Sequence, residues 1–383
     1  MVKKRNVLLI KSEKTHKGAA AVLAGAFKNH PDLRFISIGE DKLGFKSVNT
    51  LRVLCLRALK RSPLLMRGAA RLQKVFADRS INDTPSGDKD KKQLPGKEKK
   101  LKNAVLRFEP AAIVAMTPFD MRLVLRTRKK AGLKTPVVGI LNTFTLDFGF
   151  FDMSADAYLA LDEAAKEKMV GLGYPEDKVT VAGYPVDAKA LSEEEIAEIR
   201  AGLSVPKTPC VYLSGGSFAP PALIQVFNML ADQGEIINLV LPASENKKAT
   251  KSLHRAADAK ASGNVKLLSS SEPDSDYFLA SDIVCTIYDA ELIYKSILLN
   301  KPVIVFGPEN DVETADLEYL AEKGLIYYAK TLPETVIGLY NILQSDFKER
   351  QKDAAESFIK PSAEGALVKI ISALAASAKK DED

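Results

Sequence analysis

Residues 136–187 read PVVGILNTFTLDFGFFDMSADAYLALDEAAKEKMVGLGYPEDKVTVAGYPVD and set the pattern that the rest of the chain follows. Three apolar runs, at 136–140, 157–160 and 179–182, have the length of buried strands. A helical stretch at 163–172 separates the last two runs. Strands that alternate with helices are typical of a parallel sheet covered by helices, so this stretch predicts part of a doubly wound α/β domain.

The same alternation extends from this stretch toward both ends of the chain. On the N-terminal side it predicts strands at 7–10, 35–38 and 111–116, with helices at 18–29 and 120–131. After a charged helix at 192–202 and a Pro-containing connector at 203–209, the pattern restarts. It then predicts strands at 210–213, 237–241, 265–268, 283–286, 302–306 and 326–328, with helices closing the chain at 333–344 and 362–378.

The restart after the connector indicates a second domain. The chain has 383 residues, of which 46% are hydrophobic, and this suits two hydrophobic cores. We expect an N-terminal Rossmann-like domain at 1–186 and a C-terminal one at 207–355. Residues 356–383 should form a helix that returns to the N-terminal domain, because their apolar side chains recur at helical spacing and need a surface to pack against.

Charge is divided unevenly along the chain. Residues 1–140 contain 32 Lys and Arg against 11 Asp and Glu, a net charge of +21, whereas residues 141–383 contain 23 against 38, a net charge of −15. An asymmetry of this size predicts that the N-terminal half binds a polyanion, either an anionic membrane or a nucleic acid.

Residues 50–78 combine apolar and basic side chains, as amphipathic helices at a membrane interface do, and Pro63 should divide them into two helices. An alternative stays open, in which the apolar residues are core and the cations form a solvated face. Nucleic acid is disfavoured, because Phe76 is the segment's one aromatic residue and no nucleic-acid motif is present. The side chains expected to dock on an anionic lipid surface are Arg52, Arg57, Lys60, Leu64, Leu65, Arg67 and Arg71.

Three further features concern order and location. Residues 80–100 carry few apolar side chains, so burial cannot offset the entropy of ordering them, and we expect a mobile insertion. No stretch reaches the roughly 18 apolar residues of a membrane-spanning helix, and no signal-peptide cleavage site follows the N-terminus. Cys55, Cys210 and Cys285 each lie in an apolar run, which suits buried thiols in a reducing compartment and argues against a metal site. We therefore expect a cytoplasmic protein, peripheral to the inner face of the membrane.

Two segments that follow predicted strands carry candidate site residues. Gly215, Gly216 and Ser217 follow the strand at 210–213, where glycines let backbone N–H groups approach a phosphate or diphosphate. A plain strand-to-helix turn would explain these glycines equally well. His16 follows the strand at 7–10, at the edge where open α/β sheets bind ligands, and an imidazole there is suited to act as a general base. A lone histidine is more often an ordinary surface residue.

Together these segments resemble a known family. Residues 136–158, 162–173 and 181–187 are similar to the domain junction of monogalactosyldiacylglycerol synthases, processive diacylglycerol glucosyltransferases and, more distantly, the glycosyltransferase MurG. Thr117-Pro-Phe119 resembles a His-Pro-Phe that follows a strand in these proteins. The resemblance implies the GT-B architecture, with two Rossmann-like doubly wound domains and an interdomain cleft. It also implies a UDP-sugar held by the C-terminal domain and a lipid acceptor held by the N-terminal one.

The resemblance further assigns roles to individual residues. His16 falls where the family places a catalytically important histidine, and Gly215-Gly-Ser217 resembles its diphosphate loop. Asp311 or Glu313 falls where the family contacts the sugar.

The chain departs from the family at this donor site. Residues 287–295, Ile-Tyr-Asp-Ala-Glu-Leu-Ile-Tyr-Lys, stand where the family has a Gly-Gly pair and a glutamate, and residues 308–316 keep only Glu313 of a Pro-x-x-Gly-Gln-Glu-x-x-Asn stretch. Two hypotheses therefore remain open. The chain is a hexosyltransferase that moves a sugar from a UDP-sugar to a membrane lipid and needs no other cofactor, or it is a catalytically inactive GT-B relative that acts as a membrane-associated binding or scaffold protein.

Overall fold

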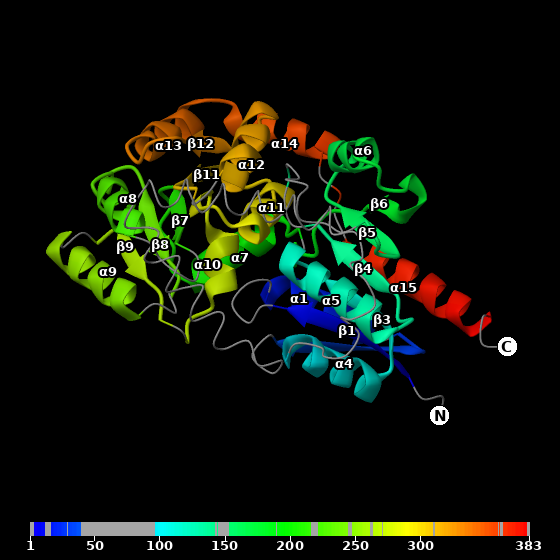
Figure 1. Cartoon of the computed structure of the whole chain (residues 1–383). Coiled ribbons are helices and arrows are strands. Elements are labelled where there is room, and N and C mark those ends of the chain that lie inside the picture. The colour runs from blue at the N-terminus through cyan, green and yellow to red at the C-terminus, as the bar shows by residue number, and fades with distance from the viewer. Residues whose placement is uncertain are drawn as a thin grey trace, which may run out of the picture. The chain divides into compact units, whose positions relative to one another are not determined.

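The computed structural model describes residues 4–11, 17–28, 30–39, 96–141, 144, 153–188, 190–215, 221–243, 247–260, 263–269, 271–308, 311–358, 360 and 363–380. The chain forms two compact units. The first consists of Met1–Asn142, Leu146–Pro185 and Ser362–Asp383, and the second of Thr143–Thr145 and Val186–Pro361. Each unit is built on a parallel sheet with helices packed against it (Figure 1).

The first sheet has six parallel strands in the described residues, in the order β2-β1-β3-β4-β5-β6. Its strands are β1 (Arg5–Lys11), β2 (Leu33–Gly39), β3 (Pro110–Ala115), β4 (Val137–Ile140), β5 (Ala157–Ala160) and β6 (Val179–Val181). Its helices are α1 (Lys17–Lys28), α4 (Gly96–Phe108), α5 (Pro118–Ala131), α6 (Glu163–Gly171), the short 3-10 helix η3 (Glu176–Lys178) and α15 (Ala363–Lys380).

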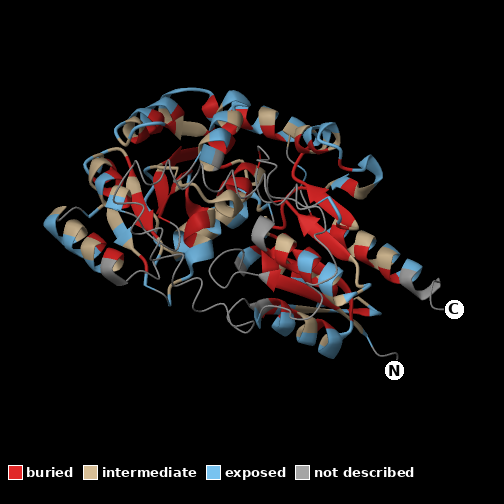
Figure 2. Cartoon of the chain, viewed as in Figure 1, coloured by how far each residue is buried: buried red, intermediate tan, exposed pale blue. Residues whose placement is uncertain are grey.

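The central strands of this sheet are buried on both faces, as a parallel sheet between two helical layers requires (Figure 2). Tyr158 of β5 packs edge to face on Tyr174 at a ring distance of 5.1 Å, and its hydroxyl accepts a hydrogen bond from the Ala155 N–H. Gly139 of β4 allows the Met121 side chain of α5 to approach the strand closely, because a Cβ at this position would lie 2.0 Å from the Met121 Cε. The sequence pattern therefore places a continuous apolar core in this unit.

The final helix, α15, packs against α1, β3 and β5 of the first unit. Leu367 and Ile371 are fully buried, and the Arg5 guanidinium donates to the Ala375 carbonyl at 2.7 Å. Helix α15 thus packs on a sheet whose described strands all precede residue 182.

The second sheet likewise has six parallel strands in the described residues, in the order β12-β11-β10-β7-β8-β9. Its strands are β7 (Cys210–Ser214), β8 (Asn238–Leu241), β9 (Val265–Leu267), β10 (Ile283–Ile287), β11 (Val303–Phe306) and β12 (Tyr327–Ala329). Its helices are α7 (Glu193–Gly202), α8 (Pro221–Ala231), α9 (Lys247–Lys260), α10 (Asp274–Ala280), α11 (Ala290–Leu298), α12 (Asp311–Glu322), α13 (Glu334–Gln344) and α14 (Phe347–Phe358).

The second unit extends beyond the expected range of 207–355 on both sides. Helix α7 belongs to it because the Arg200 guanidinium donates to the Ala280 carbonyl and to Asp282. Helix α14 belongs to it because the buried Gln351 side chain donates to the carbonyls of Lys301 and Leu325.

The expectation that residues 80–100 form a mobile insertion was wrong for the last five of them. Residues 96–100 do not belong to a mobile insertion but form the first turn of α4. Glu98 is buried there and pairs with Arg126 and Lys130 of α5, and Leu101 is buried beside it. These contacts with a distant helix supply the order that local composition did not predict. Residues 80–95 lie outside the described part of the chain.

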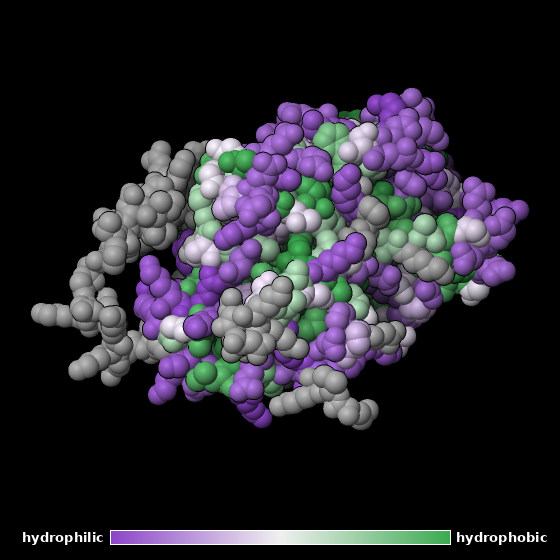
Figure 3. All heavy atoms as spheres, turned by 90° about the vertical axis from the view of Figure 1, so that its right-hand side faces the viewer, coloured by the Kyte–Doolittle hydropathy of each residue, from purple (hydrophilic) through white to green (hydrophobic). Residues whose placement is uncertain are grey.

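Both described cysteines, Cys210 and Cys285, are buried free thiols, as expected, while Cys55 lies outside the described residues. Burial raises the pKa of Cys210 to about 11 and raises that of Cys285 as well. On the face drawn in Figure 3, hydrophilic residues cover most of the surface and hydrophobic ones lie between them in small areas.

Candidate functional site

The carboxyl ends of β7, β10 and β11 meet at one edge of the second sheet. Strand β10 lies between the other two, with Cys285 paired to Leu213 on one side and to Ile304 on the other. From β7 the chain continues to β8 and β9 on one side, whereas β10 continues to β11 and β12 on the other. This reversal is a topological switch point, and ligands of open α/β sheets bind in the crevice beside it.

Backbone features dominate the β7 and β11 ends of this edge. Gly215 follows β7 directly and is buried. Gly307 follows β11 with φ of +61°, a left-handed conformation that side chains disfavour, and it leads the chain toward α12. The first turn of α12 then presents Asp311, which is exposed, and Glu313, which is half-buried.

A tyrosine and a buried aspartate connect β10 to α12. The Tyr288 hydroxyl, in the loop after β10, donates to Asp316 Oδ2 at 2.5 Å. Asp316 is fully buried in the second turn of α12. Desolvation, followed by the nearby carboxylates of Asp316, Glu313 and Asp289, holds the pKa of Tyr288 well above its ordinary value. The hydroxyl therefore stays protonated and remains a donor at neutral pH.

Asp289 occupies the N-terminus of α11. It is the N-cap residue, and its Oδ1 accepts from the Leu292 N–H at 3.1 Å. Desolvation raises the pKa of the Asp289 carboxyl, although the backbone hydrogen bonds oppose this shift. The carboxylate takes the place at this helix end where an external anion would otherwise be favoured.

The edge thus has two parts of different chemistry. Near β10 and α12, the carboxylates and the tyrosine oxygen can accept hydrogen bonds from the hydroxyl groups of a neutral polyol, and the carboxylates repel a phosphate. Near β7, Gly215 presents backbone without a side chain, which suits the approach of an anion. A sugar at the first part and a phosphate at the second would match this division.

The first sheet has a corresponding edge. Ile10 of β1 pairs with Ala115 of β3, so these two strands end side by side. After β3, Thr117 caps α5: its hydroxyl accepts from the Asp120 N–H at 3.1 Å and donates to Asp120 Oδ2 at 2.6 Å. Thr117, at the position that resembles the family's His-Pro-Phe, therefore has a helix-capping role.

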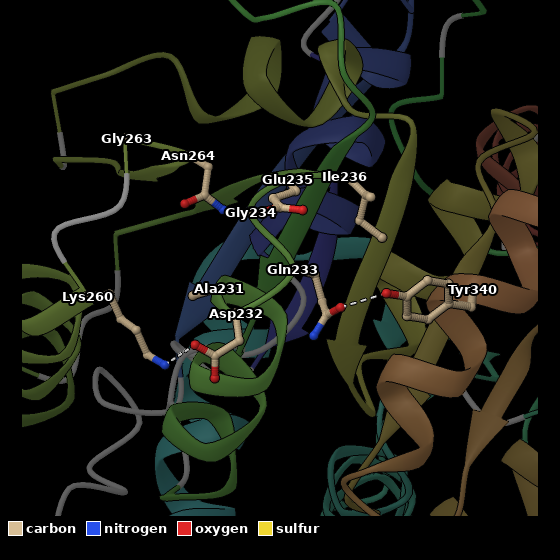
Figure 4. Close-up of a pocket in the computed structure, with 10 residues that line it drawn as sticks. All are labelled: Ala231, Asp232, Gln233, Gly234, Glu235, Ile236, Lys260, Gly263, Asn264 and Tyr340. Atoms are coloured by element: carbon tan, nitrogen blue, oxygen red, sulfur yellow. Dashed lines mark hydrogen bonds and ion pairs between the residues drawn. The ribbon is translucent and has the colours of Figure 1, made fainter.

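A pocket of about 470 Å³ opens elsewhere on the second unit (Figure 4). Its lining residues come from the ends of α8 and α9, the segments before β8 and β9, and α13, so it lies at the amino ends of β8 and β9. Four of its polar residues form two pairs: Lys260 with Asp232, and the Tyr340 hydroxyl with Gln233 Oε1 at 2.8 Å. The position and the internal pairing both favour the carboxyl edge as the functional site.

No cluster of three or more His, Cys, Asp or Glu side chains in the described part of the chain could hold a metal ion. No helix there is both long and apolar enough to cross a membrane.

Solved structures share the fold of this chain. Alr3699/HepE from Anabaena, in complex with UDP and glucose, matches with a TM-score of 0.55 and 16% identity, over 96% of this chain and all of that one (100%). MurG from Acinetobacter baumannii matches with a TM-score of 0.60 and 14% identity, over 96% and 99% of the two chains. The chain has the GT-B fold. A UDP-GlcNAc 2-epimerase from Neisseria meningitidis bound to UDP-GlcNAc also matches this GT-B chain, with a TM-score of 0.61, 12% identity, and 96% and 99% coverage.

Relatives found by sequence are named as glycosyltransferases. The processive diacylglycerol β-glucosyltransferase of Staphylococcus saprophyticus is 22% identical over 240 residues, which are 62% of this chain and 60% of that protein. The chain therefore matches about three fifths of the length of this relative. The enzyme of the same name from Bacillus cereus is 24% identical over 277 residues, 71% of this chain and 70% of that protein. No protein-family model matches the chain. The protein is glycosyltransferase-like in sequence and has the GT-B fold.

The structure brings some of the expected site residues together. Gly215, Asp311 and Glu313 lie at the same edge of the second GT-B sheet. His16, Gly216 and Ser217 lie outside the described residues. The expected membrane-docking residues also lie outside them, namely Arg52, Arg57, Lys60, Leu64, Leu65, Arg67 and Arg71.

Sequence reasoning missed Tyr288, Asp289 and Asp316 as a connected group. The available signals were that Tyr288 and Asp289 directly follow an apolar strand, and that Asp316 lies three residues after Glu313 on one face of a helix. The pairing between Tyr288 and Asp316 depends on how α12 packs, so no local pattern predicts it.

Proposed function

We propose that this protein transfers a hexose from a UDP-sugar to a membrane lipid acceptor. The observation that carries the proposal is the composition of the switch-point edge in the second unit: bare backbone at Gly215 for the diphosphate, and Asp311 and Glu313 on α12 for the sugar hydroxyls. Structural neighbours with this fold that contain UDP support the donor, and relatives named diacylglycerol glucosyltransferases support the acceptor.

The fold alone does not choose the reaction, because epimerases of UDP-GlcNAc share it. The sequence relatives favour transfer over epimerisation. In the proposed reaction the acceptor hydroxyl oxygen attacks the anomeric carbon, the bond from that carbon to the diphosphate oxygen breaks, and UDP leaves. His16 takes the proton of the acceptor hydroxyl, and Gly215, Gly216 and Ser217 hold the diphosphate.

The first unit offers a described surface for an anionic membrane. Helices α4 and α5 pack together, and both acidic residues within them, Glu98 and Asp120, are buried. Exposed apolar area is added by Leu106 of α4, a residue that is 56% exposed. The exposed basic residues of the two helices are Lys99, Lys100, Arg107, Arg126, Lys129 and Lys130. A positive surface with an apolar residue among the cations matches an anionic bilayer, and it would act together with the segment at 50–78.

Donor binding is tested first, by calorimetry with UDP and with common UDP-hexoses. We expect binding by the wild-type protein and none by Gly216→Asp, because a carboxylate would stand where the diphosphate binds. His16→Ala should lower turnover and leave donor binding largely intact. If the wild-type protein binds no UDP-sugar at millimolar concentration, hexosyl transfer is excluded and the inactive binding or scaffold role takes its place.

Membrane docking is tested by co-sedimentation with phosphatidylglycerol and phosphatidylcholine vesicles at low and high salt. We expect binding only to the anionic vesicles and release by salt, because each cation near such a surface contributes about 1 kcal/mol. Lys99→Glu/Lys100→Glu should weaken binding at least roughly ten-fold. Lys348→Glu/Lys352→Glu on α14 makes the same charge change in the second unit and should bind as the wild type does. Equal loss in both variants, or binding that ignores lipid charge, would count against this surface.

A further inference from the structure

The strongest unassigned feature of the second unit is the hydrogen bond between Tyr288 and Asp316. It joins the loop after β10 to the second turn of α12, two segments that α11 and β11 separate in the chain. Asp316 is fully buried and Leu317 beside it is fully buried as well, so this turn of α12 is held against the unit's core.

Two acidic residues of α12 precede this turn. Glu313 lies three positions before Asp316 and therefore on the same face of α12. Its carboxylate is close enough to Tyr288 to act on the tyrosine hydroxyl electrostatically. Asp311 is the first residue of α12 and lies two positions, about half a turn, before Glu313. The orientation of both acidic side chains therefore depends on where the Asp316 turn is anchored.

We propose that Tyr288 and Asp316 are positioning residues that hold the first turn of α12 so that Asp311 and Glu313 meet the hexose of the donor. This inference rests on the proposed function, because it assumes that those two carboxylates contact the sugar. The hydroxyl of Tyr288 fixes one oxygen of Asp316, and α12 keeps one orientation relative to the end of β10. The pair thereby sets the affinity for the hexose. The nucleotide part of the donor binds at the β7 end of the edge and does not depend on the pair.

Loss of the Tyr288–Asp316 bond should lower the affinity for UDP-sugar and leave the affinity for UDP nearly unchanged, whereas a general loss of stability would lower both. UDP lacks the hexose, so its affinity reports on the nucleotide part alone. In Tyr288→Phe, which loses only the hydroxyl, UDP-sugar affinity should fall roughly ten-fold while UDP affinity changes less than about two-fold. Asp316→Ala should behave in the same way. Asp316→Asn should retain most of the wild type's ratio of UDP-sugar affinity to UDP affinity, because an amide oxygen also accepts a hydrogen bond from the tyrosine.

Tyr212→Phe is the matched control. The Tyr212 hydroxyl, on β7, donates to Asp274 Oδ1 at 2.7 Å, so the variant removes a Tyr–Asp bond of the same kind that is anchored on α10. It should leave the ratio of UDP-sugar to UDP affinity unchanged. A similar fall of that ratio in Tyr212→Phe and Tyr288→Phe would overturn the positioning role.

Hydrogen exchange of the ligand-free protein tests the positioning role independently of UDP-sugar binding. Amides in the first two turns of α12 should exchange faster in Tyr288→Phe and not in Tyr212→Phe. Unchanged exchange in α12 overturns the positioning role even if the wild-type protein binds UDP-sugars. Absence of UDP and UDP-sugar binding by the wild-type protein instead overturns the proposed function, and with it the assignment of Asp311 and Glu313 to a hexose.

Discussion

Lys301 is a buried lysine without a direct carboxylate partner among its described contacts. The residue is 8% exposed, and its ammonium donates to the carbonyls of Leu279 and Ser281 at 2.8 and 2.6 Å, at the C-terminal end of α10. Burial is the main cause that lowers its pKa to about 8, while Asp282 opposes the shift. The folded protein therefore releases this proton at lower pH than the unfolded chain does.

This residue makes stability depend on pH in a definite direction. Between about pH 8 and the ordinary lysine range, the unfolded chain binds the proton that the folded protein has released, so the contribution of Lys301 to stability rises with pH. The unfolding free energy of the wild type should increase relative to Lys301→Met by up to about 1 kcal/mol per pH unit over this range. Urea unfolding of both proteins from pH 7 to 10 measures the difference, and a difference independent of pH would contradict the assignment.

At the scale of elements, two helical glycines have opposite environments. A Cβ on Gly338, in the middle of α13, would lie 2.5 Å from the ring of Tyr327 on β12, whereas Gly365 of α15 has open space around it. Replacing a helical glycine with alanine contributes about 1 kcal/mol through helix propensity. Overpacking against a fixed ring costs about 1–3 kcal/mol, so at Gly338 the steric cost is the larger effect.

The two alanine substitutions should therefore change stability in opposite directions. We expect Gly338→Ala to lower the unfolding free energy and Gly365→Ala to raise it by about 0.5–1 kcal/mol. Thermal unfolding followed by circular dichroism measures both. Stabilisation by Gly338→Ala would mean that the Tyr327 ring moves aside without cost.

At the scale of the whole molecule, the C-terminal helix belongs to the N-terminal fold. Because Leu367 of α15 is fully buried in the first unit, Leu367→Ala should destabilise that unit by about 2–5 kcal/mol. Hydrogen exchange should accelerate in β3 and β5 of the first unit and stay unchanged in β7 and β10 of the second. Lys369→Ala, at an exposed position of the same helix, serves as the control and should alter neither. Equal acceleration in both sheets would indicate that the two units unfold together.

Local sequence determined the strands of both sheets and their division between two domains. The runs at 137–140, 157–160 and 283–287 are short, apolar and bounded by turns, so burial in a parallel sheet is the one way to satisfy both their side chains and their backbone. The edge of the second sheet that carries Gly215 followed from the same reasoning, because parallel strands all end on one side. Length and local periodicity sufficed for these features.

Tertiary structure alone decided the features that depend on partners distant in the chain. Helix α4 begins at Gly96, within a stretch of loop-like composition, because Glu98 is buried beside the cations of α5. The Tyr288 hydroxyl donates to Asp316 although 28 residues separate the two in the chain. Burial and charge pairing between distant residues leave no periodic trace in either segment, so the order of α4 and the link between Tyr288 and Asp316 emerge only when the chain is folded.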